Sequence, residues 1–172
     1  NPYNYIDDLE VSRYEYLAQF YKNNVRQKNH LTYEFFSSCA EEIHKNKSFQ
    51  KYRNKIDLVF TSPPYFNAEI YSGESTDSAI RYPTYDEWRD NFLFKTLDTC
   101  VRYLKKEGIL IWNIADMEDH RTKVMIPLES DTVEILESLG MTYIDKLKYV
   151  LAKTTGSGRT GKITDLPTHK NF

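Results

Sequence analysis

Residues 56–66 read IDLVFTSPPYF, a stretch that combines an apolar run with an abrupt stop. The near-continuous apolar run at 56–60 predicts a strand that is buried on both faces, as in parallel sheets. Two consecutive prolines cannot lie inside a hydrogen-bonded ladder, because each lacks an amide donor and has a fixed φ. The strand is therefore predicted to end at Thr61 and Ser62, and two aromatic residues follow the prolines at once.

The rest of the chain is predicted to alternate between strands and helices. The expected elements are a helix at 7–27, a strand at 31–36, a polar helix or loop at 41–53, the strand at 56–60, a helix from 84 to 107, a strand at 108–114, a helix at 131–139 that stops at Gly140, and a final strand or pair of strands at 141–152. This alternation predicts an α/β fold with a largely parallel sheet and helices on both of its faces.

The helix from residue 84 has signals at both ends. Thr84 followed three residues later by Glu87 is a capping box at the start. Lys105 and Lys106 suit the negative end of a helix dipole, and Gly108 is placed to supply a left-handed stop. The sequence therefore predicts one long helix that ends just before Gly108.

Ligands of open parallel sheets bind beyond the carboxyl ends of the strands. The end of the 56–60 strand presents Ser62, Tyr65 and Phe66 there, on a backbone stiffened by the prolines. Asn113 and Asp116 end the next apolar run and are candidates for substrate contacts on the same side. The alternatives are a rigid loop with aromatic lids over the core, and loop capping for the last two residues.

The composition is that of a globular domain. The 172 residues, 40% hydrophobic and 28% charged, are enough for a core and argue against disorder. Cys39 and Cys100 lie far apart without CxxC or His spacing, so we expect no metal site and no disulfide framework. There is no apolar stretch of membrane-spanning length and no signal-peptide pattern, so we expect no membrane partner and a reducing, cytoplasmic compartment.

Charge is unevenly distributed along the chain. The formal net charge of −2 gives no bulk attraction to nucleic acid. Residues 145–172, however, contain six Lys or Arg against two Asp. We interpret residues 1–172 as a single domain and 153–172 as a basic Gly/Thr-rich loop or tail. Such a segment suits phosphate contacts, and a solvated tail is the alternative.

A buried strand that ends in [D/N/S]-P-P-[Y/F/W] resembles the catalytic signature of S-adenosylmethionine-dependent amino-methyltransferases. Residues 55–67 (KIDLVFTSPPYFN) and 82–116 (from YPTYDEW to NIAD) together resemble the core of the DNA enzymes that methylate adenine N6 or cytosine N4. The resemblance implies a Rossmann-like methyltransferase fold, S-adenosylmethionine as cofactor and DNA as partner. Enzymes of this kind occur in restriction-modification systems.

The resemblance also assigns roles to the motif. An aryl amine is a poor nucleophile, because its lone pair is delocalised into the ring. Ser62 Oγ and the carbonyl of Pro63, fixed with the help of Pro64, are expected to accept the N–H groups of the target base and to free that lone pair. Tyr65 is expected to stack on a base flipped out of the duplex, and Phe66 to wall the pocket.

The first motif position carries serine, which in this family is commoner among cytosine-N4 enzymes than among adenine-N6 enzymes. We therefore favour cytosine N4. Relatives with asparagine at this position act on RNA guanine or protein glutamine, and an RNA or protein amide methyltransferase is one alternative. A catalytically inactive module of the same fold that binds nucleic acid or another partner is the other.

The glycine loop expected for the cofactor is the main departure from the family pattern. No glycine precedes Tyr65. Residues 156–161, GSGRTG, spell G-x-G-x-x-G, but a proline and no helical pattern come after them, which favours a simple Gly/Ser/Thr loop.

Truncation is our interpretation of that departure. The first residues, NPYNYIDDL, resemble the segment after the ribose-binding acid in relatives whose glycine loop comes first, and the chain has no starting Met. The chain would then lack the first two strands and hold an incomplete cofactor site. Ser38 and Cys39, at the end of the 31–36 strand, would lie near the adenine ring of the cofactor; ordinary strand-end polar residues are the alternative.

Overall fold

The computed structural model of the protein describes residues 34–68, 70, 75–119 and 121–148. The elements in this part of the chain are η2 (Ala40–Lys45), α3 (Lys47–Gln50), β1 (Ile56–Thr61), η3 (Phe66–Ala68), α4 (Ser78–Arg81), α5 (Tyr85–Trp88), η4 (Arg89–Leu93), α6 (Phe94–Tyr103), β2 (Leu104–Trp112), β3 (Met117–Glu118), β4 (Met125–Ile126) and α7 (Leu128–Ser138). The predicted helix at 7–27 and the segments 153–172 and 156–161 lie outside the described residues.

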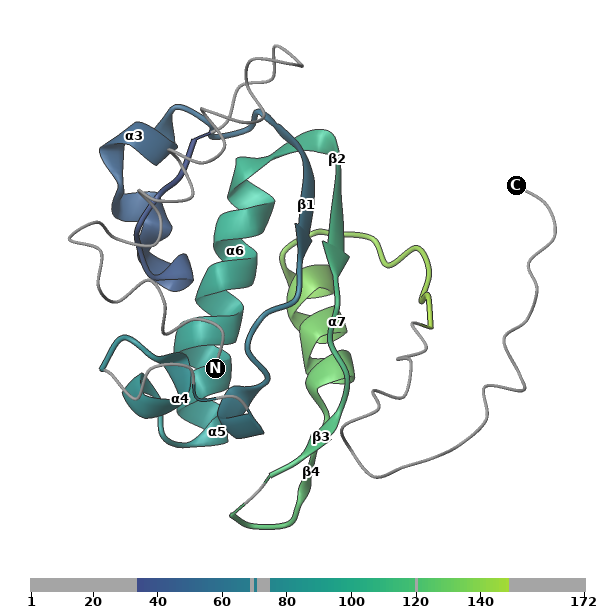
Figure 1. The fold of residues 1–172 in the computed structure, drawn as a ribbon. Helices are drawn as coiled ribbons and strands as arrows, with labels where there is room; N and C mark the ends of the chain where they lie inside the picture. The colour runs from purple at the N-terminus through teal and green to yellow at the C-terminus, as the bar shows by residue number, and fades with distance from the viewer. Residues whose placement is uncertain (1–33, 69, 71–74, 120, 149–172) are drawn as a thin grey trace, which may run out of the picture.

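The centre of the fold is a parallel pair of strands, β1 and β2, which run side by side in Figure 1. The strand predicted at 56–60 is confirmed as β1, and the one predicted at 108–114 lies within β2 and the residues directly after it. Strands of one parallel pair need a crossover between them, and the helix formed by α5, η4 and α6 supplies it. An α/β fold with parallel strands is confirmed, in the form of an incomplete Rossmann-like sheet.

The crossover helix begins as predicted and ends earlier than predicted. Thr84 and Glu87 form both hydrogen bonds of the capping box. The helix ends at Tyr103, and Leu104 already pairs with Ile56 of β1. The predicted stop at Gly108 is therefore wrong, because strand pairing overrides the C-terminal helix signals.

Gly108 is needed in β2 for a different reason. The strand register shifts at this point, because Ile56 pairs with Leu104 whereas Leu58 pairs with Ile109. A side chain on Gly108 would place its Cβ 2.9 Å from Leu104 Cδ2 and 3.1 Å from the Ile56 carbonyl oxygen. Glycine therefore permits the close backbone approach at the irregularity.

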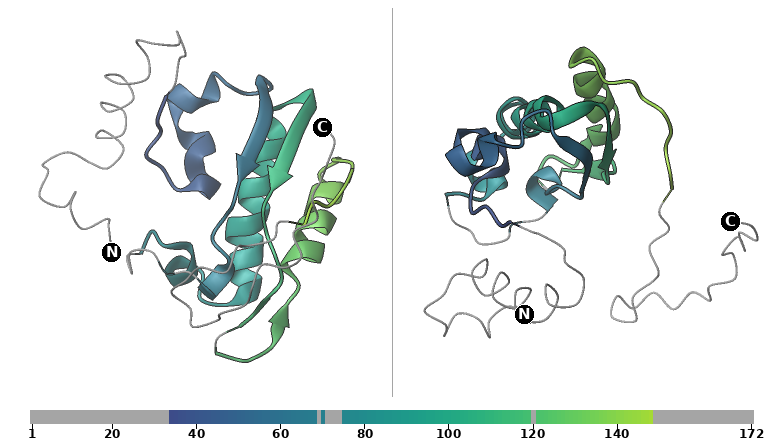
Figure 2. Two further views of the ribbon diagram at one scale, coloured as in Figure 1. Left: turned by 45° about the vertical axis from the view of Figure 1, so that its right-hand side comes forward. Right: turned by 90° about the horizontal axis from the view of Figure 1, so that it is seen from above.

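The hydrophobic core lies on one face of the strand pair, where α6 and α7 pack (Figure 2). Leu110 and Trp112 of β2 pack from the sheet onto this core. The core consists of Phe66, Trp88, Phe92, Leu93, Leu97, Met117, Ile126, Leu128 and Ile135. Helices α6 and α7 therefore cover the face of the strand pair from which Leu110 and Trp112 reach the core.

The other face of the strand pair is open within the described part of the chain. Leu58 and Phe60 of β1 are 52% and 73% exposed, and Ile109 and Ile111 of β2 are 52% and 44% exposed. The prediction of a strand buried on both faces is therefore wrong for these residues. Alternate side chains of a strand point to opposite faces, so only one half of each apolar run reaches the core.

Three further elements differ from the prediction. Residues 34–36 and 141–148 contain no strand, so the described parts of the strands predicted at 31–36 and 141–152 are not formed. A short antiparallel hairpin, β3–β4, was not predicted; Met117 pairs with Ile126, and Glu118 pairs with Met125. Helix α7 matches the helix predicted at 131–139 but begins three residues earlier, and Gly140 comes after it with the positive φ of 87° expected of a stop.

No helix among the described residues is long and apolar enough to span a membrane.

Candidate functional site

The proline corner, residues 62–65, lies at the carboxyl end of β1. The backbone N–H of Asn113 donates to the Thr61 carbonyl oxygen at 2.9 Å and extends the pairing of β1 with β2 by one step. Ser62 is exposed immediately beyond this bond, whereas Pro63 is buried. Two strands therefore deliver the predicted Ser62 and Asn113 to the same edge of the sheet.

Side-chain hydrogen bonds tie the corner to the end of β2. Asn113 Nδ2 donates to Ser62 Oγ at 3.2 Å, and the Tyr65 hydroxyl donates to the Asn113 carbonyl oxygen at 3.2 Å. A hydroxyl oxygen has two lone pairs, so Ser62 Oγ can accept a second hydrogen bond. The structure thus brings three predicted residues, Ser62, Tyr65 and Asn113, into one hydrogen-bonded group.

Phe66 lies in the core, and its predicted place on a pocket wall is wrong. The ring is 0% exposed and contacts Trp88 and Tyr85 with centroids 5.9 Å and 5.7 Å away. Its φ of 42° lies in the left-handed region, which turns the chain inward directly after Tyr65. Phe66 therefore anchors the corner and has no exposed surface with which to face a base.

Asp116 caps a helix. Its Oδ1 accepts a hydrogen bond from the backbone N–H of Glu129 at 2.9 Å, in the first turn of α7. A carboxylate at this place satisfies a free amide and suits the positive end of the helix dipole. The geometry thus favours the capping alternative over a substrate contact for Asp116.

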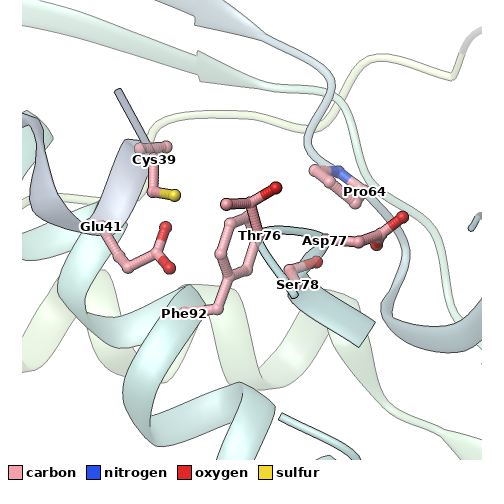
Figure 3. Close-up of a pocket in the computed structure, with 8 residues that line it drawn as sticks. Cys39, Glu41, Pro64, Thr76, Asp77, Ser78 and Phe92 are labelled. Atoms are coloured by element: carbon pink, nitrogen blue, oxygen red, sulfur yellow. The ribbon is translucent and has the colours of Figure 1, made fainter. Parts of the chain in front are cut away.

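A pocket of about 290 Å³ is lined in part by Pro64 of the corner (Figure 3). Its lining residues are Cys39, Ala40, Glu41, Pro64, Thr76, Asp77, Ser78 and Phe92. Cys39 and Glu41 face Pro64 and Asp77 across the space. Of the two residues predicted to contact a cofactor, Cys39 lines this pocket, while Ser38 is exposed outside the lining and donates to the Cys39 carbonyl oxygen at 3.3 Å.

Glu41 is the most buried charged group of the pocket, with 3% of its surface exposed. Its Oε1 accepts from Arg81 Nη1 at 3.0 Å and from the Tyr82 hydroxyl at 3.3 Å. Arg81 also contacts Glu42 and, together with Lys45, lowers the pKa of that carboxyl to about 2. Helix α4 is thereby tied to η2, which holds Glu41 at the pocket.

Sequence reasoning missed the acidic and hydroxyl lining of the pocket. Thr76, Asp77 and Ser78 belong to the loop after the corner, and nothing in their order indicates that they fold back against Cys39. Ser78 is held there because Trp88 Nε1 donates to its Oγ at 3.2 Å. The adjacent Glu41 and Glu42, soon after Cys39, were the one available signal.

Within the described ranges, the structure contains no group of three or more His, Cys, Asp or Glu side chains placed to hold a metal ion. Both cysteines are free thiols.

Comparison of the sequence with known proteins gives two matches. The model of the DNA methylase family of N6/N4 type matches residues 56–162. The type II beta methyltransferase M.BslI of Bacillus sp. (strain NEB-606) is 25% identical over 107 residues, which cover 55% of this chain and 10% of that protein. The chain thus spans a small part of the length of this relative. No solved structure matches the chain significantly.

Proposed function

The chain belongs to the DNA methylase family of N6/N4 type, and from this premise we propose that it transfers a methyl group from S-adenosylmethionine to the exocyclic amino nitrogen of a DNA base. The observation that carries the proposal is the exposed Ser62 hydroxyl at the end of β1, held by Asn113 and followed by a rigid pair of prolines. This arrangement supports the proposal, because the reaction needs fixed hydrogen-bond acceptors that hold the amino group.

The chemistry of the corner follows from hydrogen-bond capacity. A base amino group has two N–H donors and a lone pair delocalised into the ring. Ser62 Oγ accepts one N–H and the Pro63 carbonyl accepts the other, which draws the nitrogen toward a tetrahedral geometry. Positive charge develops on this nitrogen as it is methylated, and fixed acceptors stabilise that charge. The surplus proton leaves to solvent, to which Ser62 is open.

Asn113 acts through Ser62 in this proposal. Its amide nitrogen donates to Ser62 Oγ, so one lone pair of the hydroxyl is used and the position of the oxygen is fixed. Its backbone carbonyl also accepts the Tyr65 hydroxyl. Asn113 is therefore assigned a positioning role, in place of the direct substrate contact expected from the sequence.

Tyr65 is assigned to stacking. Its ring is partly buried against the core and its hydroxyl donates to the Asn113 carbonyl, and these contacts fix the orientation of the ring. A base must leave the duplex before its amino group can reach such a corner, and stacking on an aromatic face offsets part of the cost of unstacking. This contribution is about 1–3 kcal/mol per base.

The pocket behind Pro64 has groups that fit part of the cofactor. The Glu41 and Asp77 carboxylates suit hydroxyl, ammonium or sulfonium groups, and Phe92 offers an apolar surface. At about 290 Å³ the pocket is just below the usual range of about 300–1,000 Å³ for small-molecule sites. When bound, S-adenosylmethionine supplies an electrophilic methyl group on a sulfonium sulfur. We assign Cys39 and Glu41 to holding it, and Ser38 stays a weaker candidate.

We favour cytosine N4 over adenine N6 as the acceptor, since the family resemblance associates serine at position 62 with N4 enzymes. The test is to incubate the protein with unmethylated DNA and S-adenosylmethionine, digest the DNA to nucleosides and identify the product by mass spectrometry. N4-methylcytosine is the expected product. N6-methyladenine would contradict the base preference and leave the reaction type intact.

Two controls make this experiment specific. Ser62→Ala removes the proposed acceptor, whereas Ser138→Ala removes a hydroxyl at the far end of α7, where Oγ donates to the Ile135 carbonyl. The first variant should lose the methylated nucleoside and the second should keep it. Absence of any product, with no heat on titration of S-adenosylmethionine into the protein, would favour the inactive binding module. Methylation of RNA or protein alone would favour the other alternative.

A further inference from the structure

A partly buried hydrogen bond joins the β3–β4 hairpin to the turn directly after the proline corner. Asn67, two residues after Tyr65, donates from Nδ2 to Asp119 Oδ1 at 2.8 Å. Asp119 is 6% exposed although it lies between the two short strands of the hairpin. An ionised carboxylate can only accept hydrogen bonds, so the amide nitrogen of Asn67 must be the group that faces it.

The hairpin holds this carboxylate in a fixed position. Oδ1 also accepts the backbone N–H of Arg121 at 2.8 Å. The backbone of Asp119 is bonded on both sides, since its N–H donates to the Val124 carbonyl at 2.8 Å and its carbonyl accepts the Lys123 N–H at 2.9 Å. The N–H of Arg121 and then the amide of Asn67 lower the pKa of Asp119 to about 2, so the carboxylate is ionised at neutral pH.

Arg121 gives the hairpin a second contact with the same turn. Its guanidinium carbon lies 5.8 Å from the centroid of the Phe66 ring, within the range of a cation–π contact. Its Nη2 donates to the Pro83 carbonyl oxygen at 2.5 Å, next to the capped start of α5. Arg121 therefore spans from the hairpin across Phe66 to the crossover helix.

The turn that receives these contacts has a strained backbone. Phe66 has a φ of 42°, a region that a non-glycine residue occupies only where its surroundings hold it. The turn is closed by the Ala68 N–H, which donates to the Tyr65 carbonyl at 2.9 Å. Contacts on both sides of Phe66 maintain this local conformation. The orientation of the Tyr65 ring depends on it.

We propose that Asp119 and Arg121 are positioning residues, which hold the 66–68 turn so that Tyr65 keeps its place at the proline corner. The role of Tyr65 in transfer rests on the proposed function, whereas its placement by the hairpin does not. Figure 1 shows the hairpin beyond the carboxyl ends of β1 and β2. The hairpin thus braces the corner from outside the sheet.

The test is a set of substitutions at the Asn67–Asp119 bond in the full chain. Asn67→Ala removes the bond between the two elements and keeps the Asp119–Arg121 bond of the hairpin. Hydrogen exchange of the Ala68 amide should rise by about tenfold to a hundredfold, the value of one hydrogen bond to a charged group. The kcat of methyl transfer should fall by a similar factor, while the KM for S-adenosylmethionine and the melting temperature change little.

A swap and a matched control separate positioning from general damage. The double variant Asn67→Asp with Asp119→Asn restores a donor–acceptor pair and should recover both slow exchange and kcat, whereas Asn67→Asp alone places two carboxylates together and should lose both. Glu118→Ala removes an exposed carboxylate of the same hairpin that pairs with Lys123 at 3.5 Å, and it should change neither.

The outcomes also distinguish this inference from the proposed function. The inference is overturned if Asn67→Ala changes neither the exchange rate of the Ala68 amide nor kcat. It is also overturned if the double variant recovers neither of them. Faster exchange with normal kcat overturns the positioning role and leaves the brace as a purely structural contact. If the wild-type protein transfers no methyl group, the proposed function is overturned. Amide exchange of Ala68 in Asn67→Ala and in the double variant then decides whether the hairpin holds Tyr65.

Discussion

Two substitutions of Tyr65 separate the effect of its hydroxyl from the effect of its ring at the proline corner. The structure gives it a hydroxyl that donates to the Asn113 carbonyl at 3.2 Å and a partly buried ring that packs against the hydrophobic core. Tyr65→Phe removes the first and keeps the ring. Tyr65→Ala removes both. The two variants should therefore differ by the contribution of the ring alone.

The magnitudes follow from ordinary values for these interactions. One hydrogen bond of this length to a neutral carbonyl contributes about 0.5–1.5 kcal/mol, so Tyr65→Phe should lower the rate by about twofold to tenfold. Stacking on a base adds about 1–3 kcal/mol. Because about 1.4 kcal/mol is a factor of ten, Tyr65→Ala should lower kcat/KM for DNA by roughly tenfold to a thousandfold.

The assay is transfer of a tritiated methyl group to DNA at several DNA concentrations, with the melting temperature of each variant as a folding check. The loss in Tyr65→Ala should appear against DNA, while the affinity for S-adenosylmethionine stays near the wild-type value. Equal losses in the two variants would show that the hydroxyl, not the ring, is the group that matters. A fully active Tyr65→Ala would refute the stacking role altogether.

Three further predictions concern the scaffold. Leu97→Ala, at a side chain that is 0% exposed, should lower the free energy of unfolding by about 2–5 kcal/mol in a denaturant titration. Tyr85→Phe removes a hydroxyl that donates to Asp131 Oδ2, a carboxylate that Arg89 also contacts, and should cost about 1.5–3 kcal/mol in the same assay. Burial raises the pKa of Cys100 to about 11 from 9.0, so the thiol should resist iodoacetamide at pH 8 in the folded protein and react after unfolding. Because the pKa of Cys100 is lower in the unfolded chain, the unfolded chain loses the thiol proton first as the pH rises, and the free energy of unfolding should decrease between pH 9 and 11. Rapid alkylation of the thiol in the native protein would contradict the raised pKa.

The parts of the fold that the sequence predicted are those with local causes. The strand at 56–60 stops where two prolines stop it, and the crossover helix starts at the capping box of Thr84 and Glu87. The meeting of Ser62 with Asn113 follows from the rule that parallel strands end at one edge. Each of these inferences needs only neighbouring residues or a general property of parallel sheets.

The parts that were mispredicted depend on contacts between distant segments. Lys105 and Gly108 look like the end of a helix, but pairing with β1 draws them into β2. Phe66 looks like a pocket residue, yet Trp88 and Tyr85 lie where they bury its ring. Phe60 and Ile111 are exposed although they are apolar, because the helices cover the opposite face of the β1–β2 strand pair, and the sequence does not indicate which face that is.

The hairpin and the pocket were missed for a similar reason. Strands of two residues, as in β3 and β4, leave no periodic pattern to detect. The pocket combines Cys39 with residues 76–78 from a loop that lies much later in the chain. The tertiary contacts of Arg81 with Glu41 and Glu42 bring these segments together.

The central claim is that the Ser62 oxygen grips the amino group while that nitrogen is methylated. The most direct measurement is the single-turnover rate of methyl transfer by Ser62→Ala, with S-adenosylmethionine affinity measured by calorimetry on the same sample. We predict a rate about a hundredfold below wild type at unchanged affinity, since one preorganised polar group at a developing charge has about that effect. A wild-type rate in this variant would contradict the account.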